Sequence, residues 1–311
     1  MVLTITTADL SPAVTALSHG DLRGTGGITL CCTVGSMALR DPIHLGSGEP
    51  MLLLHPFMLS QNVWKYVAPQ IADTGRYEVL APTMPGHNGG IKGQLFLDTA
   101  ELADDMERRM DELGWTTAHI VGNSLGGWVA FELERRGRAR TLTGIAPAGG
   151  WHAWTPAKFE IVFKFICGFP VWLVTKALGQ RAVKLPFAKL LAYPAISAHP
   201  DALNDADLPG IVDDFAHCPA YYQLLVKSLL LPGLSELADA QAPTHLVICE
   251  KDRVLPHPRF TRHFTSHLPE GTRITHLDGV GHIPMFEAPE LVTKVILDFV
   301  DEHVEHKRAT G

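Results

Sequence analysis

Short apolar runs alternate with longer amphipathic segments along most of the chain. Runs that end in polar or turn-forming residues are typical of buried parallel strands, and such runs lie at 50–57, 77–83, 117–123, 142–147, 244–252 and 272–280, with further candidate strands at 28–34 and 37–45. Between them, apolar residues recur at helical spacing over 98–114, 125–137 and 288–303. The alternation predicts an α/β fold, a mostly parallel central sheet with helices on both faces.

The alternation stops between about 148 and 235, where aromatic residues and prolines accumulate without a clear strand pattern. We interpret residues 148–235 as an inserted helical cap, residues 26–147 and 236–305 as the core, and residues 1–25 as an irregular N-terminal lead-in. An insertion that follows the carboxyl end of a strand lies over the crevice where open α/β sheets bind ligands. The cap is therefore expected to cover the functional site.

Composition narrows the class of protein. The chain of 311 residues is 46% apolar and 19% charged, which is enough material for a large core. Its formal net charge of −7 gives no support for nucleic acid or anionic lipid as a partner. Five cysteines, an odd number without a C-x-x-C pair, argue against a disulfide framework or a zinc site. They favour a reducing compartment, so we expect a cytoplasmic protein.

Targeting and membrane-spanning segments are not expected. The first twenty residues have no basic start and no long apolar run, so they do not match a signal peptide. The most apolar stretch, 159–175, is 17 residues long and contains Glu160, Lys164, Gly168 and Pro170. A stretch this short and interrupted does not span a bilayer comfortably.

The stretch "VGNSLGGW", residues 121–128, places Ser124 between Gly122 and Gly126. It follows a strand pattern and precedes a helical one, which is the setting of a nucleophile elbow. A strand-to-helix turn this sharp brings backbone segments close together, so a side chain at either glycine would collide with them. The following helix directs its N-terminal amides at the same place, where they can stabilise negative charge.

A serine hydroxyl becomes a good nucleophile only when a base, oriented by a carboxylate, takes its proton. Asp252 lies at the end of the predicted strand 244–252, and His282 lies just past the next strand. Both strand ends point at the sheet edge that carries Ser124, so we expect these three residues to form a catalytic triad. Glu250 is the rival acid, but strand alternation turns it away from the site.

With these motifs the sequence resembles the α/β-hydrolase family over about residues 26–304, in particular the large group of serine hydrolases with a helical cap. That group includes esterases and the C–C bond hydrolases of aromatic ring cleavage. The resemblance implies Ser124 as the nucleophile, Asp252 as the orienting acid and His282 as the base.

The resemblance also implies an oxyanion hole formed by the backbone amides of Leu125 and Phe57. The chain departs from the family pattern here, because the turn usually reads His-Gly and this chain has Pro56 after His55. Proline has no amide hydrogen, but the amide that contributes belongs to the next residue. The bulky Phe57 and Met58 are expected to narrow the mouth of the crevice.

Several functions are set aside by what the motifs lack. A dehalogenase or epoxide hydrolase of this fold would need a carboxylate at the position of Ser124. The glycine-rich stretch 84–90 lacks the lysine of a phosphate-binding P-loop. We interpret His87, within that stretch, as a loop residue rather than a metal ligand, and we expect neither a cofactor nor a metal.

The sequence thus predicts a serine hydrolase that cleaves a carboxylic ester or thioester of an apolar small molecule through an acyl-enzyme on Ser124. One alternative is a C–C hydrolase of vinylogous diketones, which shares the GNS-x-GG pattern but usually has tryptophan where this chain has Ile283. An alternative of another class is a non-catalytic ligand-binding protein on the same fold. The oligomeric state stays open.

Aromatic residues of the cap should line the substrate pocket. We expect the pocket to include Met58, Trp151, Trp154 and Ile283. A cap of this size cannot bury all its aromatic side chains within itself. Some of the aromatic residues in the first part of the cap are therefore expected to face the core and roof an apolar pocket. These residues are Trp151, Trp154, Phe159, Phe163 and Trp172.

Overall fold

The computed structural model describes residues 39–94, 97–152, 154–186, 188–230 and 232–310, so the predicted lead-in 1–25 and the predicted strand 28–34 lie outside the described residues. The described chain contains a seven-stranded sheet. Its strands are β1 (Ile43–Gly46), β2 (Glu49–Leu54), β3 (Tyr77–Ala81), β4 (Ala118–Asn123), β5 (Ala139–Ile145), β6 (Thr244–Cys249) and β7 (Arg273–Leu277).

Across the sheet the strands follow the order β1-β3-β2-β4-β5-β6-β7. Strand β1 pairs with β3 in the antiparallel sense, and the other neighbouring pairs are parallel. The predicted α/β class with a mostly parallel sheet is thereby confirmed. Because β2, β4, β6 and β7 are parallel, their carboxyl ends, and the loops that follow them, meet at one edge of the sheet.

The first strand is shorter than the predicted 37–45. Pro42 directly precedes β1, and a proline cannot donate a ladder hydrogen bond. Arg40 lies two residues before Pro42. Its backbone amide donates to the carbonyl of Gly89 at 2.9 Å, and the Arg40 guanidinium donates to Asp214 at 3.0 Å. This segment is therefore fixed by loop and cap residues and not by the sheet.

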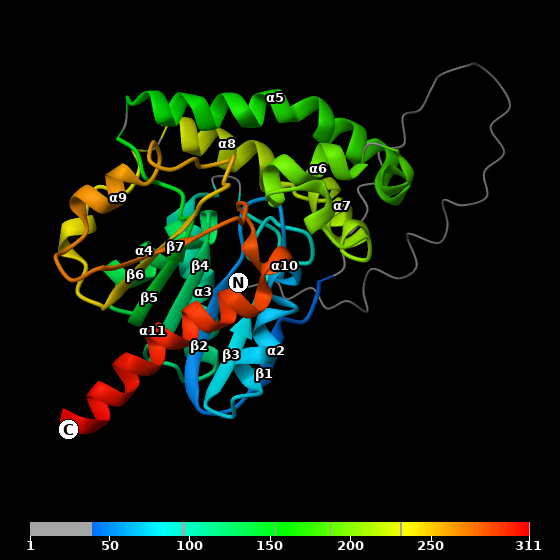
Figure 1. Cartoon of the computed structure of the whole chain (residues 1–311). Helices are drawn as coiled ribbons and strands as arrows, with labels where there is room; N and C mark the ends of the chain where they lie inside the picture. The colour runs from blue at the N-terminus through cyan, green and yellow to red at the C-terminus, as the bar shows by residue number, and fades with distance from the viewer. Residues whose placement is uncertain (1–38, 95–96, 153, 187, 231, 311) are drawn as a thin grey trace, which may run out of the picture. The chain divides into compact units, whose positions relative to one another are not determined.

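Both faces of the sheet are covered by helices (Figure 1). Along β2, Met51 and Leu53 join the core that contains α2 (Val67–Ala72) and α11 (Pro289–Thr310), whereas Leu52 and Leu54 join the core that contains α3 (Thr99–Glu112) and α4 (Leu125–Arg135). Successive strand residues point to opposite faces, and all four of these side chains are fully buried. A nearly continuous apolar strand is what two covered faces require.

Helix α3 begins where the sequence predicts. Asp98 accepts hydrogen bonds from the amides of Ala100 and Glu101, and Glu101 accepts one from the Asp98 amide at 3.0 Å. This capping box satisfies amides that the first helical turn leaves without partners. The helix ends just before Gly114, which has a φ of 71°.

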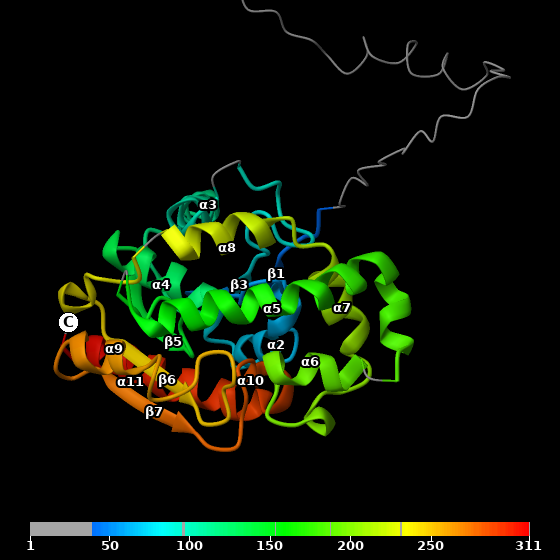
Figure 2. The ribbon, with the colours of Figure 1, turned by 90° about the horizontal axis from the view of Figure 1, so that it is seen from above.

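Between β5 and β6 the described residues form helices and loops. The helices are α5 (Pro156–Leu178), η4 (Gly179–Lys184), α6 (Ala188–Ile196), η5 (Pro200–Ala202), α7 (Leu208–Ala216) and α8 (Ala220–Leu230). We call residues 148–235 the cap. Seen from above, α5 runs along the cap with α8 beside it and α6 and α7 at its far end (Figure 2). The remaining short helices of the core are η3 (Gln61–Trp64), η6 (Leu237–Asp239), α9 (Arg262–His267) and α10 (Pro284–Glu287).

One continuous helical stretch, Pro156–Lys184, is long and apolar enough to cross a membrane by length and composition, and 17% of its most apolar window is buried. It is longer than the apolar run 159–175 because Pro170 lies within α5 without ending it. Its inner side packs on α7 and α8. This contact makes the helix part of the cap.

Candidate active site

Ser124 occupies a strained turn between β4 and α4. Its φ is 55° and its ψ is −114°, a conformation that a residue with a side chain rarely adopts. A Cβ at Gly122 would lie 2.1 Å from the carbonyl oxygen of Gly126, and one at Gly126 would lie 2.3 Å from the Leu54 oxygen. These distances exclude side chains at both glycines, so this turn needs the glycine pattern of the sequence.

Asp252 and His282 are paired in the loops after β6 and β7. Nδ1 of His282 lies 2.6 Å from Oδ2 of Asp252, and both side chains are almost fully buried. The other carboxylate oxygen accepts from the amides of Val254 and Leu255, each at 2.8 Å. A carboxylate held in this way fixes the imidazole with Nδ1–H toward Asp252 and Nε2 free to take a proton.

The rival acid Glu250 lies outside this arrangement. Its carboxylate accepts from the amide of Gly279 at 2.8 Å and pairs with Lys251 at 2.8 Å, on the surface of the protein. The described residues include no hydrogen bond between Ser124 and His282. Catalytic hydrogen bonds are often long until substrate binds.

The loop that carries His282 is held by two residues that the sequence analysis did not single out. The side-chain amide of Asn123 donates to the carbonyls of Ile145 and His282, at 3.0 and 3.1 Å. Glu287 accepts from the amides of Gly281 and Ala198, the latter at 3.0 Å. The Asn123 bond ties the elbow to the histidine loop, and the Glu287 bonds tie that loop to the cap.

Two amides stand where the resemblance places the oxyanion hole. Within the described part of the chain, neither the Phe57 amide nor the Leu125 amide donates a hydrogen bond to another residue. Both residues line the cavity that Ser124 lines. The geometry is thus compatible with donation to an oxyanion there.

His55 fixes the turn that contains Pro56. Its Nε2 accepts from the amide of Met84 at 2.9 Å, so its Nδ1 carries the proton that is donated to the Pro56 carbonyl at 2.8 Å. Burial and the neighbouring His87 ring hold the pKa of His55 well below its ordinary value, which keeps the ring neutral. The departure from His-Gly is therefore accommodated, with Met58 at a φ of 65° completing the turn.

Two cavities lie next to one another beneath the cap. The first, of about 70 Å³, contacts Ser124 and is otherwise mostly apolar. The second, of about 510 Å³, lies between α5, α6 and α7. Ile161, Phe165 and Val254 line both, so these three side chains form the wall between them. Only the larger cavity has the volume of an ordinary small-molecule site.

The predicted pocket residues divide into two groups. Trp151 lines the cavity beside Ser124, and Met58 lines the larger cavity. Trp154 lines neither; it is 85% exposed and lies beside Phe159 at the start of α5. Ile283 is also absent from both linings, because its side chain is buried in the core that α11 covers.

Helical geometry explains which cap aromatics face inward. Ile161, Phe165 and Trp172 share one side of α5, with a spacing of three to four residues per turn, and pack toward the sheet. Phe159 and Phe163 lie on the other side and are 46% and 64% exposed. Of the five aromatics from which some were expected to face the core, Trp151 lines the cavity beside Ser124, whereas Phe159 and Phe163 line neither cavity. Phe165, which the sequence analysis did not select, lines both cavities.

His87, interpreted from sequence as a loop residue, is fully buried in its loop. Its Nδ1 lies 3.1 Å from the Pro85 carbonyl, and its ring packs edge-on against His55 and Phe57. Burial lowers the pKa of His87 to about 4. It supports the turn that carries the Phe57 amide.

Comparison with known proteins agrees with the fold. The model of the alpha/beta hydrolase family matches residues 51–295. The chain belongs to the alpha/beta hydrolase family. This α/β-hydrolase is 62% identical over 214 residues to "Epoxide hydrolase EphH" of Mycobacterium tuberculosis (strain ATCC 25618 / H37Rv), an alignment that covers 69% of this chain and 100% of that protein.

More distant relatives carry different names. The α/β-hydrolase is 33% identical over 175 residues to "Soluble epoxide hydrolase" of Corynebacterium sp. (strain C12), covering 54% of this chain and 60% of that protein. A thermophilic esterase from Thermogutta terrifontis has the same fold, with a TM-score of 0.64, 20% identity and coverage of 85% of this chain and 93% of that one. The α/β-hydrolase is therefore a hydrolase enzyme, and two of its relatives are named for epoxides.

Proposed function

We propose that this α/β-hydrolase cleaves carboxylic esters of apolar acids through an acyl-enzyme on Ser124. The observation that carries the proposal is the arrangement at one sheet edge: a serine on a strained elbow, a buried Asp252–His282 pair 2.6 Å apart, and a mostly apolar cavity that Ser124 lines. These are the parts that nucleophilic acyl transfer requires.

The chemistry has two halves. His282 Nε2 takes the Ser124 proton as Oγ attacks the ester carbonyl, the amides of Phe57 and Leu125 stabilise the oxyanion, and the proton passes to the departing alcohol as the C–O bond breaks. His282 then takes a proton from water, which attacks the acyl carbonyl. The acyl–Oγ bond breaks, the acid leaves, and Ser124 recovers its proton.

The cavities indicate the kind of acyl group. The volume of about 70 Å³ beside Ser124 suits only the reacting carbonyl and a few carbon atoms. The neighbouring chamber of about 510 Å³ has walls of aliphatic and aromatic side chains and would take the rest of an acyl chain. Each methylene buried there would contribute about 0.8 kcal/mol of binding.

Epoxide hydrolysis is the second candidate, favoured by the name of the 62% identical relative. Attack by the Ser124 oxygen on an epoxide carbon would form an ether, which has no carbonyl for water to attack, so turnover would stop. An epoxide would have to be opened directly by water. His282 would take a proton from that water as its oxygen attacks a ring carbon and the ring C–O bond breaks, and protonated His282 or solvent would return a proton to the alkoxide to give a diol. Such a reaction would not need the serine hydroxyl.

The Ser124→Ala variant separates the two reactions. For p-nitrophenyl esters from acetate to palmitate, we expect the variant to lose about 10⁶-fold in kcat, together with labelling of the Ser124 peptide by a fluorophosphonate. Ester hydrolysis within tenfold of wild type would overturn the proposal. Hydrolysis of an aryl epoxide at equal rates by wild type and variant, without ester hydrolysis, would establish the second candidate instead.

A further inference from the structure

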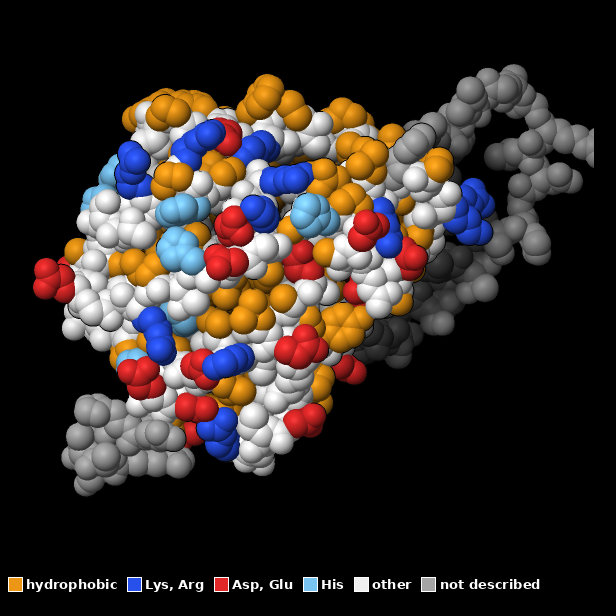
Figure 3. All heavy atoms as spheres, in the orientation of Figure 1, with side chains coloured by type: hydrophobic (Ala, Val, Ile, Leu, Met, Phe, Trp, Pro, Cys, Tyr) orange, Lys and Arg blue, Asp and Glu red, His pale blue; other side chains and the backbone are white. Residues whose placement is uncertain are grey.

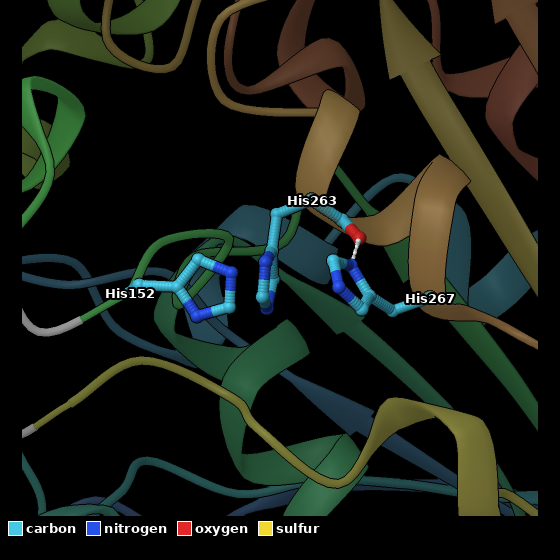
Figure 4. A group of neighbouring side chains, drawn as sticks. All are labelled: His152, His263 and His267. Atoms are coloured by element: carbon cyan, nitrogen blue, oxygen red, sulfur yellow. Dashed lines mark hydrogen bonds between the residues drawn. The ribbon is translucent and has the colours of Figure 1, made fainter.

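Three histidines from the cap and the core meet outside the active site (Figure 4). His152 follows β5 at the start of the cap, and His263 and His267 lie one helical turn apart on α9. One nitrogen of each ring lies within 4.8 Å of one nitrogen of the other two. The His263 ring stands between its neighbours, with centroid distances of 4.5 and 4.6 Å.

Hydrogen bonds to backbone carbonyls fix the tautomers of two rings. Nε2 of His263 lies 2.5 Å from the Leu234 carbonyl, and Nδ1 of His267 lies 2.8 Å from the His263 carbonyl. A carbonyl can only accept, so these two nitrogens carry the protons. The other nitrogen of each neutral ring, Nδ1 of His263 and Nε2 of His267, then presents a lone pair. Histidines that bind metals commonly donate their second nitrogen in this way.

The surroundings of the three rings differ in exposure, and His263 is the buried one. His152 is exposed at the start of the cap, so its ring is free to adjust. No carboxylate belongs to the group formed by the described residues, which makes it an all-nitrogen donor set.

We propose that His152, His263 and His267 form a binding site for a divalent transition metal, with zinc as the best match. Neutral imidazole suits zinc, nickel, cobalt and copper ions, and zinc binds three histidines with a water at about 2.0–2.1 Å per nitrogen. A small inward movement of the exposed His152 ring would bring the three donor nitrogens close enough to bind one ion. The ion would link the segment before α5, which carries His152, to α9. Trp151, the neighbour of His152, lines the cavity at Ser124.

The test uses untagged protein treated with EDTA and then titrated with ZnCl₂ by calorimetry, and with CoCl₂ by visible absorption. We expect one equivalent of zinc to bind, a tetrahedral Co²⁺ spectrum, and affinity at least about tenfold weaker in His152→Ala and in His267→Ala. His217→Ala, which removes an exposed histidine elsewhere in the cap, is the matched control. Circular dichroism checks that each variant folds.

Two results would overturn the site: no saturable binding of one equivalent, or equal loss of affinity in His152→Ala and His217→Ala. Since the readouts are metal binding and a spectrum, they do not depend on the reaction that the enzyme catalyses.

A separate observation concerns the outer surface of the cap. Large apolar side chains gather there, along the upper edge of Figure 3 over α5. The most exposed are Trp154 (85%), Leu230 (69%), Phe163 (64%), Leu190 (56%), Ile166 (54%) and Val226 (54%). An exposed apolar surface of this extent on a folded protein usually marks an interaction site.

The segment 151–200, which contains α5, η4 and α6, has a formal charge of the opposite sign to that of the whole chain. Residues 151–200 contain six lysines and arginines and one glutamate, within a chain of formal net charge −7. Lys176, Arg181 and Lys184 are exposed at one end of the α5–η4 stretch and form no ion pair within the described residues. Apolar side chains bordered by unpaired cations match the surface of an anionic membrane.

We infer that this face of the cap docks on anionic lipid, with α5 lying along the surface. The helix does not need to cross the bilayer for this, because its inner side is packed on α7 and α8. The large apolar cavity is lined by the same helix and by α6 and α7. A chain drawn from the lipid would therefore have a short path into the cap.

Vesicle co-sedimentation tests the surface with the full chain at low salt. We expect binding to vesicles containing phosphatidylglycerol, weak binding to pure phosphatidylcholine, and release by 0.5 M NaCl. Phe163→Glu combined with Ile166→Glu should abolish binding, whereas Ile274→Glu, at an exposed apolar residue of β7, should not. Replacing Lys176, Arg181 and Lys184 by glutamine should weaken binding about 100-fold.

Absence of binding to the anionic vesicles would overturn the inference, as would equal effects of the α5 and β7 variants. Two other occupants are also distinguished. Binding that appears only when residues 1–38 are removed would assign the face to that segment. A dimer in analytical ultracentrifugation that the α5 variant dissociates would assign it to a second copy of the chain.

Discussion

The side-chain amide of Asn123, the residue before the candidate nucleophile, donates to the backbone carbonyl of His282 at 3.1 Å. The same amide donates to the Ile145 carbonyl at 3.0 Å. One side chain thus joins the ends of β4 and β5 to the loop that carries His282, at the carboxyl edge of the sheet. It holds the elbow and that loop together through backbone carbonyls, so in the proposed reaction Asn123 would be a positioning residue.

Replacing Asn123 by alanine should lower kcat by about tenfold to a hundredfold with little change in KM, because the His282 carbonyl loses this donor and the His282 loop loosens, while the Ile145 carbonyl still accepts from the Ser124 amide. Tyr77→Phe is the matched control, since it loses a hydrogen bond to Asp301 at the opposite end of the sheet. Steady-state kinetics and urea unfolding are measured on both variants. If Asn123→Ala and Tyr77→Phe have equal kcat values and lose similar amounts of stability, the Asn123 hydrogen bonds have only a structural role.

The two candidate acids should behave differently. Asp252→Asn should lower kcat about 10⁴-fold, because the amide cannot hold the His282 tautomer or stabilise its protonated ring. Glu250→Gln should change kcat less than threefold, since that carboxylate is on the surface and bonded to Lys251 and Gly279. A larger loss in the Glu250 variant than in the Asp252 variant would reverse the assignment.

The wall between the two cavities should set the acyl-length preference. Phe165→Ala should join them and move the optimum of kcat/KM toward longer p-nitrophenyl esters, each added methylene being worth about 0.8 kcal/mol while space remains. Phe163→Ala is the matched control on the same helix, because that side chain is 64% exposed and lines neither cavity. An unchanged chain-length profile in Phe165→Ala would show that the larger cavity does not take the acyl chain.

Stability should fall with acid because of buried histidines. Burial lowers the pKa of His87 to about 4 from an ordinary 6.5, so below pH 6.5 the unfolded chain binds a proton that the folded protein excludes. The free energy of unfolding should therefore be constant above pH 6.5 and decrease by up to about 1.4 kcal/mol per pH unit for this group between 6.5 and 4.

His55 contributes in the same direction. Urea unfolding from pH 8 to pH 4.5 measures how steeply the free energy of unfolding depends on pH. His87→Phe should reduce this dependence, and the free energy of the variant at pH 8 is the reference for its own values at lower pH. A slope that is identical in variant and wild type would exclude His87 as a source.

The sheet, the elbow at Ser124 and the placement of Asp252 and His282 after neighbouring strands could be predicted, because each strand and each turn is encoded by the residues within it. Buried parallel strands are apolar throughout, and the elbow needs glycine because a Cβ at Gly122 would lie 2.1 Å from the Gly126 carbonyl oxygen. The pocket could not be predicted in this way. Whether Phe163 or Phe165 faces inward depends on the rotation of α5 about its axis, which is set by packing on other helices.

Other features were also beyond the sequence pattern. The His152 cluster joins residues more than a hundred positions apart, and no periodicity connects them. The positive charge of residues 151–200 is hidden in the net charge of −7, because that segment contains six lysines and arginines but only one acidic residue. A net charge taken over the whole chain cannot show such a local segment.

The strained backbone of Ser124 also bears on how the enzyme evolves. A φ of 55° with a ψ of −114° is comfortable for glycine and unfavourable for any other residue, so Ser124→Gly should yield an inactive protein that is harder to unfold than the wild type. Selection for robustness alone would remove this serine. A serine at so strained a position therefore costs stability, and the reactive hydroxyl that we propose for Ser124 would account for that cost.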